Sequence, residues 1–319
     1  MKNHFKVFIL FLLCLVFSIS LLFYGEAGFT TQDALIIWQL RFPKIVVALL
    51  AGGMLSCSGL LLQIFFQNPL AGPDLLGINS GASLGVAIGI LGSSLIPIEF
   101  QSISLTAMSL MGAIFVTFFL AFIIQTKISK VSLIILGLLI ASFTSSTVNI
   151  LVNFSSALQV KNFLSWSMGS FRDVSIESLP GFLFLSLVSL ASLFFIPKKL
   201  NQYMLGDEYA LSMGVNLKTF KTMLILICSF LVAVVTSYCG PIAFIGVIAP
   251  HIARSFLKRS DVRLTLPAAF LTGSLLALLT EVILILLPGN FLGTNSLLGL
   301  IGAPVIGFYL LKNQKRVLS

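Results

Sequence analysis

The sequence has very little charge for its length. Only 9% of its 319 residues are Asp, Glu, Lys or Arg, whereas 58% are hydrophobic. Soluble domains carry about 25% charged residues. A chain this apolar cannot hide its hydrophobic surface in one soluble core, and lipid is the solvent that suits it. The composition therefore predicts an integral membrane protein.

The sequence also lacks the motifs of enzyme chemistry. It contains no phosphate-binding loop of the form G-x-x-x-x-G-K-[ST], no catalytic triad and no paired carboxylates. Its four cysteines lie singly in or beside apolar runs, and its only histidines are His4 and His251. We predict no catalytic residue, metal or cofactor, because a zinc site needs three or four ligands. His251 is expected to be a structural histidine, and ATP hydrolysis, if used, belongs to another subunit.

The net charge of +9 does not indicate a nucleic-acid partner. The basic residues stand scattered at the ends of apolar runs and form no stripe or motif. Lys2 and Lys6 precede an apolar run that is longer than the core of a signal peptide, so this run is predicted to be the first membrane helix.

Apolar runs of membrane-spanning length recur along the chain. A membrane helix needs about 20 mostly apolar residues. On this basis we predict ten spans in one transmembrane unit, residues 1–319, of an all-α membrane protein. They are Phe5–Phe23, Lys44–Phe65, Gly77–Ile96, Ile103–Ile124, Val131–Val152, Leu179–Ile196, Thr222–Tyr238, Pro241–Leu257, Leu264–Leu287 and Ser296–Leu311.

The distribution of Lys and Arg supports this count. With both termini in the cytoplasm, all of the 19 basic residues lie on the inner side except Arg41, Lys44, Lys161 and Arg172. Cytoplasmic loops of membrane proteins are enriched in Lys and Arg. Adding or removing one central helix would destroy this asymmetry, so ten spans with both termini inside are favoured.

Glycine recurs every four residues in the third predicted span, at Gly77, Gly81, Gly85 and Gly89. Residues four apart share one helix face, where small side chains let another backbone approach closely. The strip indicates tight helix packing, or a helix that lines a path.

The segment before this span is rich in helix breakers. It holds Pro69 and Pro73, which cannot continue a regular helix, and Gln67, Asn68 and Asp74, which are costly in lipid. One interpretation is a plain cytoplasmic loop. The apolar Leu70, Leu75 and Leu76 favour a structured break that packs back into the bundle.

The longest inner connection, Pro197–Lys221, contains a possible short helix. Asp207 and Glu208 suit the N-terminal end of a helix, and Tyr209, Leu211 and Met213 would expose an apolar surface. The segment is either an amphipathic loop on the lipid headgroups or, as we favour, the docking element for a cytoplasmic partner.

Charged residues in unusual places carry further hypotheses. Arg41 and Lys44 stand at the outer start of the second span, either as snorkelling anchors or as a landing site for an acidic outer partner. Glu281 is the one acidic residue well inside a predicted span. An ionisable residue there is either functional or a neutral or paired packing residue. The stretch 240–254 holds Pro241 and Pro250, so its helix is expected to be kinked or broken.

At these segments the chain resembles the permeases of iron-chelate and vitamin B12 ABC importers. The resemblance covers nearly the whole chain. It rests on Trp38-Gln-Leu-Arg-Phe-Pro-Lys44, on Ser58-Gly59 through Gln63 to Asn68-Pro-Leu-Ala71, on Leu75-Leu-Gly77, on Leu205-Gly-Asp-Glu208 with Ala210 and Gly214, on Gly240-Pro-Ile242, and on Ala249-Pro-His-Ile-Ala-Arg254. Trp166, Met168-Gly169 and Ile301-Gly-Ala-Pro304 also match.

This resemblance implies ten helices per subunit, two permease subunits, cytoplasmic ATP-binding subunits and an extracytoplasmic substrate-binding protein. It implies that a coupling helix between the sixth and seventh spans docks on the ATPase through Leu205, Gly206, Asp207, Glu208, Ala210 and Gly214. It implies that Arg41 and Lys44 face acidic residues of the binding protein. The path would run between the two permeases, partly along the second, third and fifth spans and the segments around Gln63 and Ser80. The residues assigned to this path or to the helix break are Gln63, Asn68, Pro69, Ser80, Gly81 and Gly85.

The sequence departs from its relatives at the outer side. Many relatives carry a basic residue about one turn after Glu281, where this chain has Ile283, Leu284 and Ile285. Many also carry Glu-x-Pro-x-Gly before the last span, where this chain reads Phe291-Leu-Gly-Thr-Asn295. Part of the outer docking surface therefore differs.

We expect a multi-pass permease in the inner membrane of a bacterium that imports an iron–siderophore by alternating access. Import of cobalamin or haem is the alternative. An ion-coupled secondary carrier is a third hypothesis, but such carriers often show inverted repeats and several midplane ionisable groups. The sequence shows no obvious repeat and only Glu281 in such a place. It decides neither the chelate nor whether the partner permease is a second copy.

Overall fold

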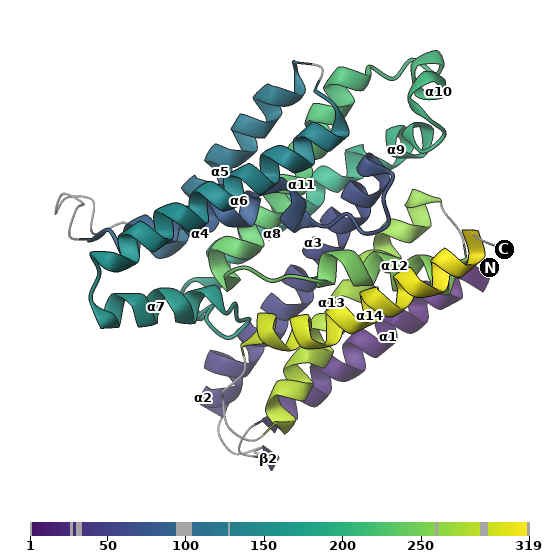
Figure 1. Ribbon diagram of the computed structural model, residues 1–319. Helices are drawn as coiled ribbons and strands as arrows, with labels where there is room; N and C mark the ends of the chain where they lie inside the picture. Colours follow the sequence, from purple (N-terminus) through teal and green to yellow (C-terminus); the bar gives the residue numbers. More distant parts are fainter. Residues whose placement is uncertain are drawn as a thin grey trace.

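The chain folds almost entirely into helices. The computed structural model describes residues 2–25, 28–29, 34–93, 104–126, 128–258, 261–287 and 293–317. Within these ranges the only extended structure is an antiparallel pair of two-residue strands, β1 (Tyr24–Gly25) and β2 (Gly28–Phe29). Figure 1 shows a bundle of long helices that run roughly side by side, with short helices at both ends.

Six helical stretches in the described part of the chain are long and apolar enough to cross a bilayer. They contain α1 (Lys2–Phe23), α3 (Phe42–Phe66) preceded by the π-helical η1 (Ile37–Arg41), α5 (Leu105–Ile124), α6 (Lys130–Asn153), α11 (Leu217–Cys239) and α13 (Val262–Leu286). A seventh span is bent by 53°, where α8 (Leu179–Ser192) and η5 (Leu193–Phe195) meet α9 (Pro197–Tyr203). Three shorter apolar stretches are α4 (Ile78–Ile90), α12 (Ile245–Leu257) and Thr294–Gly307, which is the first part of α14 (Thr294–Val317).

Every predicted span overlaps one of these helices, and the all-helical membrane fold is confirmed. The total of ten stays a prediction, because the third, eighth and tenth spans correspond to the three shorter stretches. Several boundaries differ from the predicted ones. Helix α11 begins at Leu217 and not at Thr222, and α14 continues to Val317 and not to Leu311. The helix predicted to begin at Pro241 begins at Ile245, because Gly240 and Phe244 adopt positive φ angles of 70° and 66°. Helix α4 ends at Ile90, and the end predicted for this span, Ile96, lies outside the described residues.

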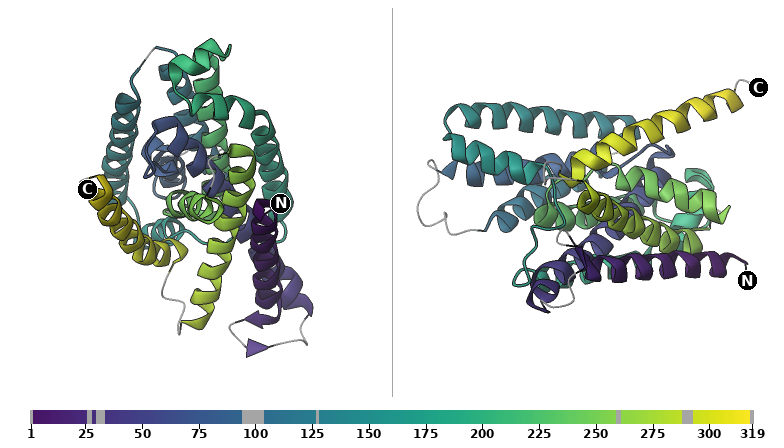
Figure 2. Two further views of the ribbon diagram at one scale, coloured as in Figure 1. Left: turned by 90° about the vertical axis from the view of Figure 1, so that its right-hand side faces the viewer. Right: turned by 90° about the horizontal axis from the view of Figure 1, so that it is seen from below.

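Both ends of the chain lie at the same end of the bundle (Figure 2), as an even number of crossings requires. The short helices α9 and α10 (Asp207–Ser212) lie at this end as well. At the opposite end are α2 (Ala34–Ile36) and α7 (Ala157–Ser167). We call the first the inner end and the second the outer end, following the orientation predicted from Lys and Arg.

Helix α3 forms the centre of the bundle. Of its most apolar window 83% is buried, compared with 17% for α1 and for α6. Gly59 of α3 lies so close to α12 that a Cβ atom would stand 1.7 Å from the carbonyl oxygen of Gly246. Two hydroxyls in this core donate to carbonyl oxygens of neighbouring helices, Ser56 to Ala269 at 2.6 Å and Ser58 to Cys228 at 3.1 Å. Small residues thus bring the central backbones together, as is common inside membranes.

The glycine strip of α4 packs against α5. A Cβ atom at Gly81 would lie 2.7 Å from the carbonyl oxygen of Gly112, and one at Gly85 would lie 2.1 Å from that of Met108. The packing interpretation of the strip therefore accounts for these two positions. Both glycines also border an open groove between α4, α5 and α6, so packing does not exclude a lining role.

Candidate functional site

The segment between α3 and α4 packs back into the bundle. Helix α3 ends at Gln67, whose φ is 51°, and a short 3-10 helix, η2 (Pro73–Leu76), precedes α4. Ala71 and Leu76 are fully buried. A Cβ atom at Gly246 would lie 2.6 Å from Cδ of Pro73. This contact brings the start of α12 against the segment before α4.

Two short helices therefore begin at neighbouring breaks. Helices α4 and α12 have 13 residues each, about 20 Å, which is less than the roughly 30 Å of a bilayer core. Non-helical backbone at membrane depth is tolerated only when protein or water surrounds it. Burial of each break against the other meets this condition.

Polar side chains hold this region together. Gln63, which is 2% exposed, donates from Nε2 to the carbonyl oxygen of Val247 at 3.1 Å and accepts a hydrogen bond from the guanidinium of Arg254. Thr236 of α11 donates to Oδ1 of Asn79 at 2.6 Å, and Asn79 donates to Asp74 at 2.6 Å. Gln63 thus ties α3 to α12, and Asn79 ties the start of α4 to α11.

The six residues assigned to the path or to the helix break are not gathered around one cavity. Gln63 is buried between helices, Asn68 and Pro69 are exposed beyond the end of α3, and Ser80 is half-buried near the start of α4. Gly81 and Gly85 border the groove between α4, α5 and α6, which has a volume of about 610 Å³. Their assignment to a path stays a prediction.

The exposed face of α6 carries a row of polar side chains that the sequence reading missed. Ser142, Ser145, Ser146, Asn149 and Asn153 are all exposed. Their spacing places them on one face of the outer half of the helix. The same face is apolar in the inner half, at Val131, Ile135 and Leu138. The spacing of these polar residues in the fifth predicted span was the available signal. We call these five residues the α6 polar row.

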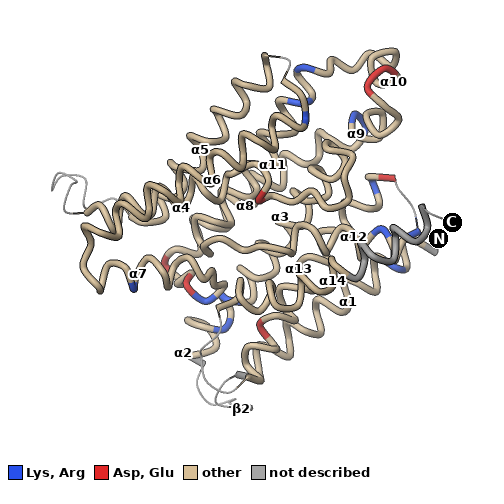
Figure 3. Tube along the Cα trace, in the orientation of Figure 1, with Lys and Arg blue, Asp and Glu red and all other residues tan. Residues whose placement is uncertain are grey.

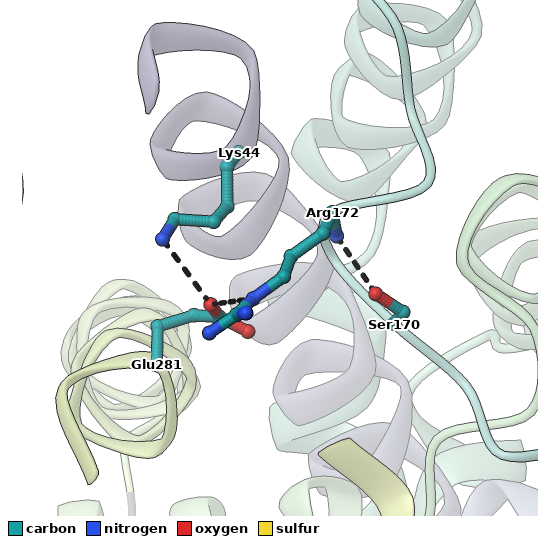
Figure 4. A network of polar contacts seen from close by, with 4 residues as sticks. All are labelled: Lys44, Ser170, Arg172 and Glu281. Carbon is teal, nitrogen blue, oxygen red and sulfur yellow. Dashed lines mark hydrogen bonds and ion pairs between the residues drawn. The ribbon is translucent and has the colours of Figure 1, made fainter. Parts of the chain in front are cut away.

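At the outer end, one buried carboxylate lies between two cations (Figure 4). Glu281 of α13 is fully buried, and its Oε2 lies 3.5 Å from Nζ of Lys44 and 3.1 Å from Nε of Arg172. The backbone N–H of Arg172 donates to the Ser170 hydroxyl at 3.0 Å. Paired burial, one of the two interpretations of Glu281, is what the structure shows.

The outer cations Arg41 and Lys44 turn inward. Arg41 is 7% exposed and donates to the carbonyl oxygen of Leu22 at 3.0 Å, while the Lys44 side chain is 12% exposed. Both residues lie at the outer end, as predicted, but both make contacts within the chain. A mutation that reverses the charge of Lys44 would therefore place a second carboxylate beside Glu281.

At the inner end, α10 forms the predicted short helix. It begins at Asp207, and Gly206 and Gly214 flank it with φ of 112° and 80°. Asp207 pairs with Lys221 of α11 at 2.6 Å, and Ala210 is fully buried, so one face of α10 is fixed to the bundle. The other face exposes Glu208, Leu211 and their neighbours, and Tyr209 and Leu211 are each 56% exposed. Leu205, Tyr209, Leu211 and Met213 form the exposed apolar surface of this loop.

A buried tyrosine connects this loop to the central helix. Tyr203, at the end of α9, stacks on Phe65 of α3 and contacts Phe220 of α11, with ring centroids 6.5 Å and 5.4 Å apart. Its hydroxyl donates to the carbonyl oxygen of Phe65 at 3.4 Å. Asn201 of α9 also hydrogen-bonds Asp261 and the N–H of Val262 at the start of α13. Movement at this inner surface would therefore act directly on α3, α11 and α13.

Most charges lie at the two ends of the molecule (Figure 3). The inner end carries basic residues near α9 and acidic residues at α10, and a mixed cluster of both signs lies near α2 and α7 at the outer end. Among the described residues, no group of three or more His, Cys, Asp or Glu side chains is arranged to hold a metal ion.

Comparison with known proteins gives a consistent picture. Residues 5–312 match the FecCD transport family. The vitamin B12 import system permease protein BtuC of Klebsiella pneumoniae is 31% identical over 290 residues, covering 90% of this chain and 86% of that protein. BtuC of Pectobacterium atrosepticum is 32% identical over 253 residues, covering 78% and 74%. A solved structure described as an inward-facing conformation of a metal-chelate type ABC transporter superposes with a TM-score of 0.86 at 26% identity, covering 97% of this chain and 99% of the other.

We predict that Glu281→Gln destabilises the fold. The substitution keeps the shape of the side chain but leaves Lys44 and Arg172 facing each other without their shared carboxylate, which we expect to cost about 1–3 kcal/mol. The stability of the purified protein in detergent measures this effect. Glu177→Gln is the control, because Glu177 is exposed in the outer connection that also holds Arg172. Equal stability of the two variants would contradict a structural role for the ion pairs.

Proposed function

The chain belongs to the FecCD transport family, and we propose that it imports a large metal chelate, an iron–siderophore as first candidate, across the inner membrane of a bacterium. The membership itself makes it a multi-pass permease subunit of a type II ABC importer. It is not the catalytic subunit, because ATP hydrolysis in such importers takes place in a separate ATPase subunit. It also works with a partner permease, which we expect to be a second copy or a related chain.

The observation that carries the proposed path is the α6 polar row. These side chains are exposed in the outer half of a helix that is long enough to cross the membrane, and the same face is apolar in the inner half. Polar groups in a membrane helix are favourable where they meet water or hydrogen-bond a neighbouring helix, and unfavourable where they meet lipid tails. We therefore infer that this face of α6 lines an aqueous path shared with the partner permease.

The chemistry of this row suits a bulky cargo that is held weakly. It consists of three hydroxyls and two carboxamides, with no charged group. Such groups hydrogen-bond many polar ligands without strong preference, and passage requires binding weak enough for release. An iron–siderophore and cobalamin both fit this description. The relatives named as vitamin B12 permeases favour cobalamin equally, so it remains the alternative cargo, with haem behind it.

The loop at the inner end is the proposed docking element for the ATPase. Its exposed apolar surface, Leu205, Tyr209, Leu211 and Met213, lies beside the exposed carboxylate of Glu208. Exposed apolar patches of this kind mark partner surfaces. The contacts of Tyr203 and Asp207 support a role in which ATP-driven movement of this loop shifts α3 and α11 between two states. Alternating access needs different contacts in those states.

The outer end is the proposed docking side for a substrate-binding protein. Arg41 and Lys44 remain the predicted contacts with acidic residues of that protein, as the family resemblance implies. Because Lys44 contacts Glu281 in this structure, an acidic partner would compete with that carboxylate. The whole chain, residues 1–319, is proposed to act as one permease unit.

We predict that Glu208→Lys combined with Leu211→Ser weakens ATPase binding at least tenfold. Loss of one buried Leu contact is worth about 1.5–3 kcal/mol, and 1.4 kcal/mol is a factor of ten. Co-purification of the ATPase with the permease measures the effect. Lys161→Glu, which changes an exposed charge on α7 at the outer end, is the control. Asp207 is left intact because it pairs with Lys221. Unchanged co-purification would remove the docking assignment.

We predict that Ser146→Leu with Asn149→Leu reduces uptake at least tenfold while the protein stays folded in the membrane. Two leucines would close part of a polar path but would be harmless on a face that meets lipid. Uptake and membrane abundance are measured together. Ser20→Leu on α1 is the matched control, since Ser20 is also an exposed serine in an apolar span. Normal uptake by the α6 variant would exclude this face from the path.

The cargo itself is tested in cells that lack this gene. We expect uptake of one labelled ligand, from a panel of iron–siderophores, cobalamin and haem, to fall and to return when the gene is restored. Loss of cobalamin uptake alone would select the alternative cargo. If none of these uptakes falls, all three proposed cargoes are contradicted, while the family membership remains.

A further inference from the structure

A pocket at the inner end joins a basic mouth to an apolar wall. It has a volume of about 620 Å³ and lies between α1, α12, α14 and the segment before η2. Lys6 of α1 and Lys258 after α12 lie at its mouth. The rest of the lining is mostly apolar and also includes two polar residues, His251 and Ser255. Its apolar members are Leu70, Val247, Ile248, Ile252, Phe256, Val305 and Ile306.

The two parts of the pocket lie at different depths. Helix α12 ends at Leu257, so Lys258 and the Lys6 contact with Phe256 mark its inner end. Val247 and Ile248 are about ten residues earlier, which is about 15 Å deeper along the helix. In Figure 2, α14 diverges from the body of the bundle toward its C-terminal end.

One of the two cations, Lys6, is held in place by contacts with α12. Nζ of Lys6 donates to the carbonyl oxygen of Phe256 at 2.6 Å and lies 5.3 Å from the centre of the Phe256 ring. An ammonium group has three donors, so this bond leaves capacity for another acceptor. Lys258 is exposed at the end of α12 with a φ of 53°. No Asp or Glu is among the described residues that line the pocket.

We propose that this pocket binds an anionic phospholipid of the inner leaflet. Its phosphate lies between Lys6 and Lys258, and an acyl chain lies along α12 against Ile248, Ile252 and Val305. The cytoplasmic leaflet carries a negative surface potential, and basic pockets between membrane helices on this side suit anionic headgroups. A bound lipid would fill the space between α12 and the diverging part of α14.

A second pocket of similar size lacks basic residues, and the comparison shows why the lysines matter for lipid selectivity. The groove between α4, α5 and α6 has a volume of about 610 Å³, and among its lining residues only Thr144 has a polar side chain. Acyl chains can occupy it whatever their headgroup. Of these two pockets, the one at the inner end combines an apolar wall with two lysines at headgroup depth, so it is the one that should distinguish anionic from zwitterionic lipid.

The test measures binding of defined lipids to the full-length permease purified with its ATPase. Cardiolipin or phosphatidylglycerol is added to the detergent-solubilised complex, and bound lipid and melting temperature are recorded against phosphatidylcholine. We expect anionic lipid to bind preferentially and to raise the melting temperature. Lys6→Gln with Lys258→Gln should weaken its binding about 10- to 30-fold, since each lysine near an anionic surface contributes about 1 kcal/mol.

Matched controls separate this site from general charge. Lys198→Gln with Lys199→Gln removes two exposed lysines of α9 at the same end of the molecule, outside the pocket, and should leave lipid binding unchanged. Lys258→Gln alone serves if the double variant does not fold. Inorganic phosphate should not reproduce the stabilisation, because the apolar wall needs an acyl chain.

Three results would overturn the assignment. These are equal binding of phosphatidylcholine, equal stabilisation by inorganic phosphate, and equal loss of binding in the α9 control. A pocket that is instead covered by the partner permease would give the first of these. No arm depends on uptake, so failure of this proposal is distinguishable from failure of the proposed cargo.

Discussion

The close approach of Gly59 and Gly246 is the contact on which the architecture depends. Because neither residue has a Cβ atom, the backbone of α12 can lie directly on α3. This contact places the start of α12 deep inside the protein. Helix α12 is too short to cross a bilayer. The segment before α4 then packs on the same place through Pro73. At membrane depth, non-helical backbone is tolerated only where protein or water surrounds it. Two breaks that pack against each other therefore cost less free energy than two separate breaks, because each shields the non-helical backbone of the other from lipid.

Electrostatics gives the two ends of the molecule different characters. At the outer end, the carboxylate of Glu281 holds Lys44 and Arg172 within the chain, so these cations already have a partner. At the inner end, Asp207 fixes α10 through Lys221, while Glu208 and the apolar side chains beside it remain on the surface. Charge thus organises the protein internally on one side and is presented to partners on the other. The proposed acidic binding protein would have to exchange one ion pair for another at the outer end, whereas the proposed ATPase surface at the inner end is already exposed.

The sequence predicted those features that are local in the chain. The apolar runs located the long apolar helices of the described part of the chain, and the pattern around Asp207 located α10, because each signal lies within one segment. The α6 polar row was equally local and was missed because the fifth span was identified from the length of its apolar run alone. The partners of Glu281 could not be predicted, because Arg172 is 109 positions away in the sequence and no local pattern brings the two residues together. The start of α12 also escaped prediction, because the left-handed backbone of Phe244 depends on packing and not on residue type. In the folded chain, the Phe244 ring lies where a Cβ atom of Gly302 in α14 would stand.

A chain of contacts links the inner surface to the breaks. Ala210 and Asp207 hold α10 to the bundle, and Tyr203 of the preceding helix rests on Phe65 near the end of α3. Gln63, half a turn before Phe65, is bonded to α12 through Val247 and Arg254. A displacement of α9 and α10 therefore reaches α12 through one helical turn of α3, without crossing a flexible segment. Such continuity does not by itself establish coupling, which requires an element with two arrangements. Helix α12 is the suitable element, because it is short, begins at a break and ends at exposed Lys258, so it can tilt without unwinding a full span.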